Sequence, residues 1–226
     1  MNQRRTGLLA KTVITAAVAF GMSGCFLDGD QHLDASYQID QPVHTLVING
    51  STGDIRVVGG GTGVSVTEHQ NYRGKAPATT HTTADGTLTL TYDCHDCGVD
   101  YQVQVPSDTV VKVAANTGTV RLVGLTAAVE ASTDTGNVEG ERLGTGRAQL
   151  RTRTGDLSVS FAGAPAAVDA RTGTGSVRLT VPGGDSYAVA ATAQTGKVEV
   201  TVPQQEGLGR TINAHAETGD VTVAHG

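Results

Sequence analysis

The residues best suited to catalysis in this chain are three aspartates, Asp54, Asp156 and Asp220, each of which directly follows a Thr-Gly step. A pair of carboxylates can hydrolyse a glycosidic bond if the two lie roughly 5–9.5 Å apart. If the segments that carry them stack in sequence order, Asp156 and Asp220 are three strand spacings apart, or about 14 Å. Because that distance is too great, we interpret all three as turn residues and predict no catalytic residues and no enzyme.

The same Thr-Gly steps could bind calcium, as the Gly- and Asp-rich turns of some β-rolls do. The residue after the glycine varies from step to step, and at one of them it is Lys197, whose charge would repel a cation. Residues 59–63 (Gly-Gly-Gly-Thr-Gly) precede a strand-like pattern rather than a helix, so they do not match a nucleotide-binding loop. We therefore expect no metal and no cofactor.

Three arginines could form an anion-binding patch. Arg151 and Arg171 occupy equivalent positions in neighbouring segments, and Arg153 is two residues from Arg151. Guanidinium groups bind phosphate and carboxylate through paired hydrogen bonds, so this patch would suit a teichoic-acid phosphate or a uronate. The alternative, which we favour, is a solvated face that is partly neutralised by Asp134 and Asp169.

Two of the three cysteines, Cys94 and Cys97, are separated by only two residues. Outside the cytoplasm such a pair favours a structural disulfide. A zinc site would need about four ligands, and there is no second cysteine pair. A redox pair of the thioredoxin type should begin a helix, whereas strand-like runs flank this one. We predict a Cys94–Cys97 disulfide, with redox and metal roles as the alternatives.

The first 24 residues have the features of a cleaved secretory signal. Arg4 and Arg5 begin it, and the apolar stretch at 8–20 is interrupted by Lys11 and is too short to span a membrane. It ends in Met-Ser-Gly-Cys25, which resembles the lipobox of bacterial lipoproteins. That resemblance implies that Cys25 carries fatty acids such as palmitate and anchors the protein to the outer face of the cell membrane. Residues 25–36 are then expected to be the lipidated cysteine and a polar tether.

The charge of the chain limits its partners. The precursor has a formal charge of −6, and removal of residues 1–24 takes away three basic residues and no acidic one. The mature chain would then have 13 basic and 22 acidic residues, a charge of −9. So acidic a protein is not expected to bind nucleic acid or an anionic membrane face as its main partner.

The Thr-Gly step recurs along the chain with a nearly constant spacing. Its glycines are Gly53, Gly118, Gly136, Gly155, Gly175, Gly196 and Gly219. A motif with a period of about 20 residues is typical of repeat architectures. We therefore predict an all-β, single-domain parallel β-solenoid, or β-helix, with about 20 residues per rung. Crossovers between parallel strands are nearly always right-handed, so we expect a right-handed coil.

Hydrophobic residues alternate with polar ones on both sides of each corner glycine, as expected of strands with one buried face. The buried positions are predicted seven and five residues before the glycine and two and four residues after it. Val111 and Val129 exemplify the first position, and Val120 and Val138 the third. The glycine itself is expected to adopt the positive φ that a tight corner needs.

We predict one solenoid domain over residues 37–226. Residues 37–110 would form irregular rungs with a loop at 71–83, and residues 111–226 would form regular repeats. Between neighbouring rungs we expect charge pairs of Arg121 with Glu139 and of Arg178 with Glu199. The last rung, residues 212–226, has no cap after it in the sequence. Because an open strand edge invites pairing, one hypothesis is self-association or partner docking through this C-terminal rung. The alternative, which we favour, is a short polar edge with His215, Glu217 and Asp220 that tolerates water.

The ordered series of motifs resembles a known bacterial family, the adhesin-like domain of unknown function found in cell-surface lipoproteins. The similarity covers about residues 40–226 and includes the lipobox, the Cys-x-x-Cys pair, the segment 99–106 (Val-Asp-Tyr-Gln-Val-Gln-Val-Pro) and rungs of the type Thr-Gly-x-Val-x-Val. The resemblance implies a β-solenoid at the cell surface. It implies no established reaction and supplies no catalytic residues.

Three functions remain open on the sequence alone. The first is a non-enzymatic, lipid-anchored envelope protein whose solenoid surface serves adhesion, binding or scaffolding, with an unidentified surface protein or cell-wall glycan as partner. The second is an accessory or regulatory partner of a membrane stress-sensing system. The third, which the aspartate spacing disfavours, is a glycan-active β-helix enzyme.

Overall fold

A computed structural model describes residues 29–93, 96–205, 207 and 209–226. The described residues form strands and connecting turns, and no helix among them is long and apolar enough to cross a membrane. The strands are β1 (Gln31–Ile39), β2 (Thr45–Asn49), β3 (Ile55–Gly59), β4 (Val64–Tyr72), β5 (Ala78–Ala84), β6 (Thr87–Asp93), β7 (Cys97–Val105), β8 (Val110–Thr117), β9 (Val120–Val123), β10 (Val129–Thr135), β11 (Val138–Leu143), β12 (Ala148–Thr154), β13 (Leu157–Phe161), β14 (Ala167–Thr174), β15 (Val177–Val181), β16 (Ala188–Thr195), β17 (Val198–Val200), β18 (Thr211–Thr218) and β19 (Val221–His225).

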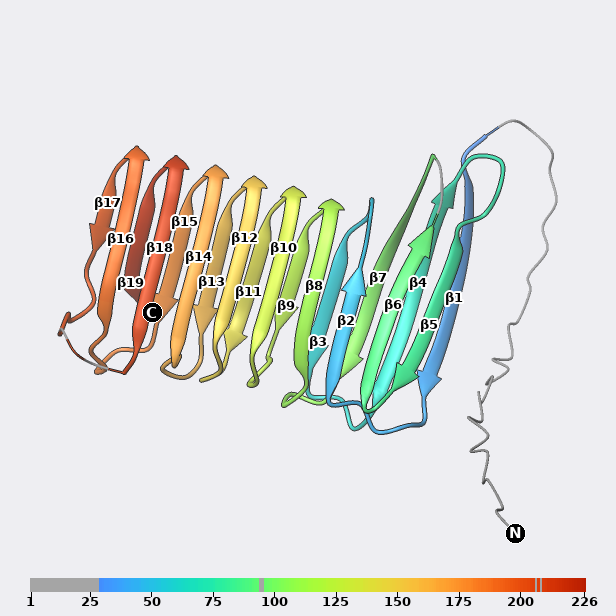
Figure 1. Cartoon of the computed structure of the whole chain (residues 1–226), viewed down its shortest axis with the longest axis horizontal. Helices are drawn as coiled ribbons and strands as arrows, with labels where there is room; N and C mark the ends of the chain where they lie inside the picture. Colours follow the sequence, from blue (N-terminus) through green and yellow to red (C-terminus); the bar gives the residue numbers. More distant parts are fainter. Residues whose placement is uncertain (1–28, 94–95, 206, 208) are drawn as a thin grey trace, which may run out of the picture.

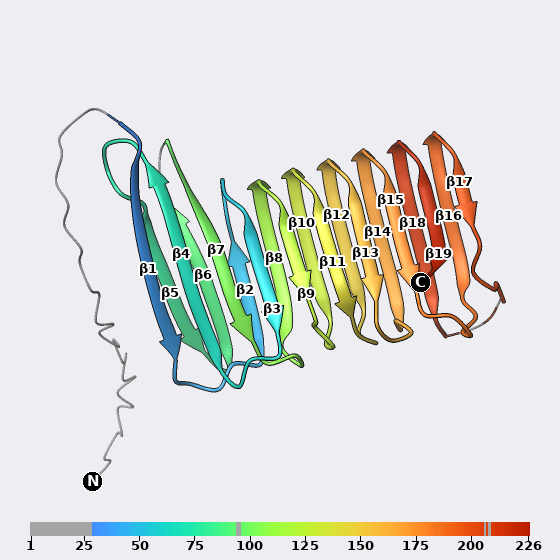
Figure 2. The same cartoon turned by 180° about the vertical axis from the view of Figure 1, so that it is seen from behind.

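The strands form two long sheets that lie face to face (Figures 1 and 2). The first sheet has the order β1-β4-β7-β3-β9-β11-β13-β15-β19-β17, and the second has the order β16-β18-β14-β12-β10-β8-β2-β6-β5. Successive strands alternate between the sheets through most of the chain. One strand of the second sheet, its Thr-Gly corner and the following strand of the first sheet therefore make one rung. This arrangement confirms the predicted all-β, parallel-rich solenoid.

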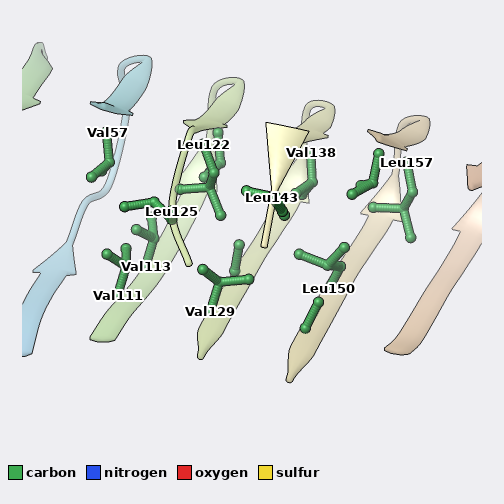
Figure 3. Packing of buried hydrophobic residues seen from close by; sticks show 14 of the residues in the cluster. Val57, Val111, Val113, Leu122, Leu125, Val129, Val138, Leu143, Leu150 and Leu157 are labelled. Atoms are coloured by element: carbon green, nitrogen blue, oxygen red, sulfur yellow. The ribbon is translucent and has the colours of Figure 1, made fainter. Parts of the chain in front are cut away.

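The predicted inward columns fill the space between the sheets. Val111, Val129, Ala148 and Val168 are aligned in register on β8, β10, β12 and β14, and all four are buried. The valines and leucines two and four residues after the corner glycines face them from the other sheet (Figure 3). Each rung alone has too little apolar surface to fold, so the core depends on continuous stacking.

The Thr-Gly corners also form one continuous column. All seven corner glycines have φ between 136° and 147°. A Cβ on any of them would lie less than 3.0 Å from a backbone carbonyl oxygen of the adjacent rung, which in six cases belongs to another corner glycine. Glycine is therefore required twice over, by its backbone conformation and by the close approach of the next rung. Inside the corners, the buried hydroxyls of Thr133, Thr152 and Thr172 donate to glycine carbonyls of the neighbouring rung.

At the C-terminal end the rungs do not stack in sequence order. The rung of β18 and β19 lies between the rung of β14 and β15 and that of β16 and β17. The prediction that residues 212–226 form the open end is therefore wrong, because that rung has a neighbour on each side. The predicted pair of Arg178 with Glu199 is also wrong, since Thr222 lies between them in the register. Arg121 and Glu139 do pair as predicted.

The N-terminal end breaks the sequence order in the same way. The rung of β2 and β3 stacks directly on that of β8 and β9, although Gly53 and Gly118 are far apart in the sequence. The intervening strands β4 to β7 extend outward on the other side of β2 and β3, so they are not rungs between those two glycines. Three of the N-terminal strand pairs are antiparallel: β1 with β4, β4 with β7, and β5 with β6.

The structure changes the predicted boundaries of the tether and of one loop. Residues 31–36, expected to be tether, belong to strand β1, which pairs with β4 along its whole length. The loop expected at residues 71–83 is restricted to residues 73–77, because β4 continues to Tyr72 and β5 begins at Ala78. The ordered domain therefore begins before residue 37.

Candidate binding site

A surface groove of about 300 Å³ lies on the outer face of the first sheet, over strands β3, β7 and β9. Its polar lining residues are Asp54, Arg56, His69, Asp100, Gln102, Thr119, Arg121 and Glu139. They come together for two reasons. Alternate residues along each strand point to the same face of the sheet. Strands β7, β3 and β9 are also neighbours in the sheet, despite their distance in the sequence. The sequence analysis did not identify this groove.

The two aspartates of the groove are oriented by backbone hydrogen bonds. An oxygen of Asp100 accepts the N–H of Asp54 at 2.7 Å, and an oxygen of Asp54 accepts the N–H of Thr119 at 2.7 Å. Each aspartate thus bonds to the next rung, and its second oxygen has no hydrogen bond to any described residue. The groove therefore has two fixed hydrogen-bond acceptors at one side.

Two arginines supply donors at the neighbouring positions. Arg56 lies in register with Gln102 on one side and Arg121 on the other. The Arg121 guanidinium forms an ion pair with Glu139, and this hydrogen-bonded carboxylate raises the pKa of Arg121. The exposed Arg56 guanidinium has neither an ion pair nor a hydrogen bond to any residue that the structure describes. Arg56 can therefore donate several hydrogen bonds to a ligand.

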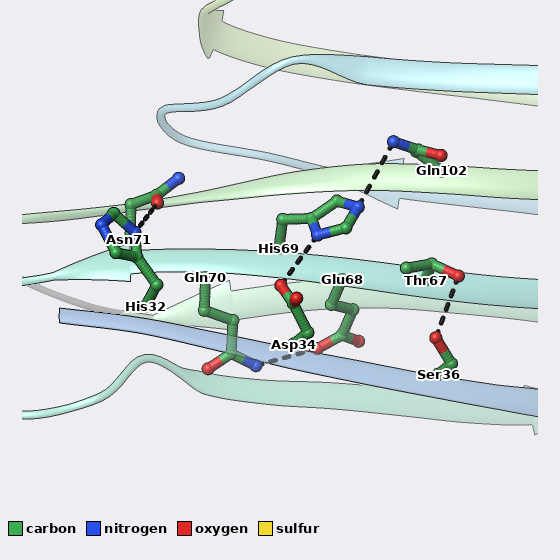
Figure 4. Close-up of polar contacts among 9 residues, drawn as sticks. All are labelled: His32, Asp34, Ser36, Thr67, Glu68, His69, Gln70, Asn71 and Gln102. Atoms are coloured by element: carbon green, nitrogen blue, oxygen red, sulfur yellow. Dashed lines mark hydrogen bonds and ion pairs between the residues drawn. The ribbon is translucent and has the colours of Figure 1, made fainter. Parts of the chain in front are cut away.

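His69 lies beside the groove and joins strands β1, β4 and β7 (Figure 4). Its Nδ1 is 2.8 Å from an oxygen of Asp34, and its Nε2 is 3.3 Å from the amide nitrogen of Gln102. An aspartate–histidine pair is part of a nucleophilic triad, but here the atom beside Nε2 belongs to an amide. The nearby Ser36 hydroxyl bonds instead to Thr67 at 3.1 Å. The pair therefore connects strands without activating a described nucleophile.

Asp34 was missed because residues 25–36 were taken as a tether. A sequence signal was present, since Leu33, Ala35, Tyr37 and Ile39 alternate with polar residues and point inward in β1. Period-two alternation of this kind predicts a half-buried strand.

A buried carboxyl group lies behind the same strands, between the two sheets. Glu68 is 2% exposed and accepts hydrogen bonds from the Tyr37 hydroxyl at 2.7 Å and from the Gln70 amide at 3.1 Å. Burial and the adjacent carboxylate raise the pKa values of Tyr37 and Tyr101. The Tyr37 ring stacks on His81 of the opposite sheet, with 4.5 Å between the ring centres. This cluster ties the sheets together at the N-terminal end.

The structure brings together the three arginines of the predicted anion patch on the outer face of the second sheet. Arg151 and Arg171 are directly in register on β12 and β14. Asp169 lies 2.7 Å from Arg171 and 3.9 Å from Arg151, and Asp134 lies 3.0 Å from Arg153. Two carboxylates thus accompany three guanidinium groups, which leaves a smaller positive charge than the sequence pattern suggests.

The distance argument for the turn aspartates needs correction. Because the C-terminal rung is inserted, Asp156 and Asp220 are two strand spacings apart rather than three, which is roughly 10 Å. Both side chains accept a backbone N–H of the next rung, from Ser176 at 2.7 Å and from Lys197 at 2.8 Å. They serve as turn residues. No cluster of three or more potential metal ligands occurs among the described residues.

The cysteine predictions remain untested. Cys25 and Cys94 lie outside the described residues, and Cys97 is the first residue of β7. The lipid attachment at Cys25 and the Cys94–Cys97 disulfide therefore stay predictions.

Taken together, the strand order, the glycine corners and the groove define a two-sheet, largely parallel β-solenoid with a polar groove on one face. The chain belongs to the Toastrack DUF4097 family, whose sequence profile matches residues 100–224. This membership confirms the resemblance noted from the sequence motifs.

The chain is similar to solved structures, and the first of the two named here shows the same fold. A proposed cell adhesion protein from Clostridium sporogenes has 13% sequence identity and a TM-score of 0.54, over 87% of this chain and 100% of that one. A proposed adhesin from Bacteroides fragilis has 14% identity and a TM-score of 0.46, over 86% of this chain and 97% of that one. No curated protein matches the chain significantly.

Proposed function

We propose that this protein is a non-enzymatic binding protein of the cell envelope, anchored through an acylated Cys25 to the outer face of the membrane. The solenoid presents the groove beside Arg56 to a ligand on the cell surface. Two features support an extracytoplasmic location: the signal-like residues 1–24 and the similarity to proposed adhesins.

The observation that carries the proposal is the Arg56 guanidinium, which pairs with no residue of the described ranges, beside the fixed carboxylates of Asp54 and Asp100. Donors and acceptors alternate over a short distance, as a hydroxyl-rich ligand requires, because each hydroxyl both donates and accepts. The groove has three carboxylates and two guanidinium groups, so its charge balance favours a neutral ligand over an anionic one. We therefore propose a neutral glycan as the ligand.

Binding to immobilised glycans tests this proposal. The panel comprises neutral hexose polymers, uronate polymers and polyol phosphates, and the variant is Arg56→Ala. We expect the wild-type protein to bind a neutral polymer, and the variant to bind about tenfold more weakly, or about 1.4 kcal/mol. Arg178→Ala is the matched control, since Arg178 is an exposed arginine of the same outward column outside the groove.

Two results would contradict the proposed ligand. One is equal weakening by both substitutions, which would indicate a general effect of positive charge. The other is binding restricted to uronate or polyol phosphate and abolished by Arg171→Ala, which would assign recognition to the arginine patch on the other sheet.

Membrane anchoring is tested separately, on the intact lipoprotein in cells. Cys25→Ala should move the protein from the membrane fraction to the soluble fraction and remove the mass of the acyl chains from the mature N-terminal peptide. A variant that stays in the membrane fraction would rule out Cys25 as the anchor.

A further inference from the structure

The C-terminal end of the solenoid is a rung whose outer edge is free, apart from a short parallel bridge of Gln204 with Tyr187 just before β16. Strand β16 pairs only with β18, and β17 pairs only with β19, so both sheets end here in an edge. The rung is built like the internal ones: β16 keeps its register with β18 from Ala188 to Thr195, and Gly196 has the same φ as the other corner glycines. The rung is therefore able to accept another strand in each sheet.

Strand β16 lacks the charges, prolines and bulges that normally prevent edge strands from pairing. Strand β16 has the sequence Ala-Val-Ala-Ala-Thr-Ala-Gln-Thr, with no charged residue on either face. Val198 on β17 is 45% exposed and is the only large hydrophobic side chain among the described residues to be exposed. The inward side chains of Val189, Ala191 and Val200 are only partly buried.

The backbone of the terminal rung also has unused hydrogen-bonding groups. In the internal rungs the corner glycine N–H donates to a threonine carbonyl of the next rung, as Gly175 does to Thr218 at 2.9 Å and Gly219 does to Thr195 at 2.8 Å. Within the part of the chain that the structure describes, Gly196 has no such acceptor beyond it. An added strand would supply one.

We infer that a second copy of this chain docks on this end, so that two solenoids join end to end about a twofold axis. Two edges running in opposite directions, one in each sheet, must be covered together, and a single peptide strand would cover only one. The opposite end of the solenoid also has edge strands, β1 and β5, but each is antiparallel to its neighbour, and the nine-residue β1 is a poor match for the three-residue β17. Pairing of like ends is therefore favoured over head-to-tail growth, and it gives a closed dimer.

The charges on β17 agree with this arrangement. Antiparallel pairing of β17 with the β17 of a second copy, centred on Val198, places Lys197 of each copy opposite Glu199 of the other. Opposite charges at directly facing positions stabilise a strand pair, and like charges destabilise it. Strand β16 adds no charge, so the pairing brings no like charges together.

The dimer has a consequence that rests on the proposed lipid anchor. The chain enters the domain through β1, at the end of the solenoid opposite to β16 and β17 (Figures 1 and 2). The terminal rung is then the part of the domain farthest from the membrane. End-to-end pairing would therefore join copies on two facing surfaces.

Sedimentation equilibrium of the full chain carrying Cys25→Ser tests the pairing without acyl chains that could drive association. We expect twice the monomer mass at micromolar concentrations. Val198→Lys should give a monomer, since it places two ammonium groups at the centre of the interface. Because Val198 is exposed in the single chain, this substitution leaves the core intact. Asn213→Lys is the matched control, adding the same charge on the outer face of β18, one rung away from the end.

A charge exchange tests the register. Lys197→Glu should raise the dissociation constant about tenfold, and the double variant Lys197→Glu, Glu199→Lys should restore it by recreating opposite charges across the axis. A wild-type monomer at all concentrations would overturn the inference. So would a dimer that survives Val198→Lys, because its interface would lie elsewhere. If the double variant stays as weak as the single one, the proposed register of β17 is wrong. A failure of glycan binding leaves all these outcomes unaffected.

Discussion

The two ends of this solenoid are built differently. At the N-terminal end β1 and β5 run antiparallel to their neighbours, and Tyr37 stacks on His81 across the gap between the sheets. At the C-terminal end the last rung is parallel and regular, and its inward side chains are small. The comparison teaches that a change of strand direction and larger inward side chains end the repeat on one side, whereas on the other side the repeat simply stops.

The ends share one feature, since at each end one rung is inserted between rungs that are not its neighbours in the sequence on both sides. At the N-terminal end β2 and β3 lie between the rungs of β6–β7 and β8–β9, and at the C-terminal end β18 and β19 lie between those of β14–β15 and β16–β17. The last residues of the chain therefore have hydrogen-bonded neighbours on both sides. Fraying from the C-terminus, which is usual for chain ends, should be suppressed here.

The largest effect on stability is expected when a Cβ is added at a corner glycine inside the solenoid. In Gly155→Ala the new Cβ would lie less than 3.0 Å from the Gly136 carbonyl oxygen, and φ at this position is +147°. Both rungs are held in place by further rungs, so neither can move away. We expect a loss of about 4 kcal/mol or more in the free energy of unfolding, measured by urea denaturation.

Gly196→Ala introduces the same clash in the terminal rung and sharpens the comparison. The Cβ would meet the Gly219 carbonyl, but the terminal rung has no outer neighbour and can lift away. Hydrogen exchange should show lost protection confined to β16 and β17. Gly183→Ala, where a Cβ meets nothing within 4 Å, is the control and should leave stability unchanged. Equal global destabilisation by both corner variants would contradict the view that the last rung is independent.

A second prediction concerns the N-terminal end of the solenoid. Glu68→Ala removes the acceptor of the hydrogen bonds from Tyr37 and Gln70 and leaves both donors buried. We expect a loss of roughly 1–3 kcal/mol in the free energy of unfolding, with lost hydrogen-exchange protection in β1 and β5. Protection in β16 and β17 should not change. Loss of protection at both ends at once would indicate that the solenoid unfolds as a single unit.

A third prediction compares one side-chain position in two adjacent rungs. Val221 and Val198 are in register on β19 and β17, but Val221 is fully buried and Val198 is 45% exposed. Val221→Ala should lower the free energy of unfolding by roughly 1–2 kcal/mol, and Val198→Ala by less than about 0.5 kcal/mol. Thermal unfolding of the monomeric protein checks both. Similar losses would mean that the terminal rung is covered in solution.

The sequence was sufficient to predict the shape of each rung but not the order of the rungs. Every rung has the same corner and the same small inward side chains, so the rung at Gly219 fits beside that at Gly175 as well as the rung at Gly196 would. Local patterns therefore do not decide between neighbours. One signal was available, because the connections at residues 182–187 and 201–210 are longer than most of the others. The first passes over the rung of β18 and β19, and the second returns the chain to that rung.

The groove was unpredictable for the same reason. It needs β7 beside β3 and β3 beside β9, and this arrangement follows from the out-of-order stacking. The turn role of Asp54 was predicted, whereas the proximity of Arg56 and Gln102 was not. In contrast, the two arginines of the second sheet, Arg151 and Arg171, belong to consecutive regular rungs and lie in register as expected.

The last prediction concerns the N-terminal end at high pH, where Tyr37 ionises. Tyr37 is partly buried and donates to Glu68, and both factors raise its pKa above the ordinary value of 10.0. The folded protein therefore keeps a proton that the unfolded chain releases. The stability contributed by Tyr37 is fully present below about pH 10 and is lost as the pH rises further, because ionisation favours the unfolded state.

Tyr37→Phe should cost about 0.5–1.5 kcal/mol at neutral pH, through the lost hydrogen bond to Glu68. It should also make the free energy of unfolding decline less steeply between pH 10 and pH 12, since one residue that ionises only on unfolding has been removed. Urea denaturation across this range, with tyrosinate absorbance recorded in parallel, measures both effects. A decline as steep as that of the wild-type protein would mean that Tyr37 ionises in the folded state. The N-terminal end would then open in alkali before the solenoid unfolds.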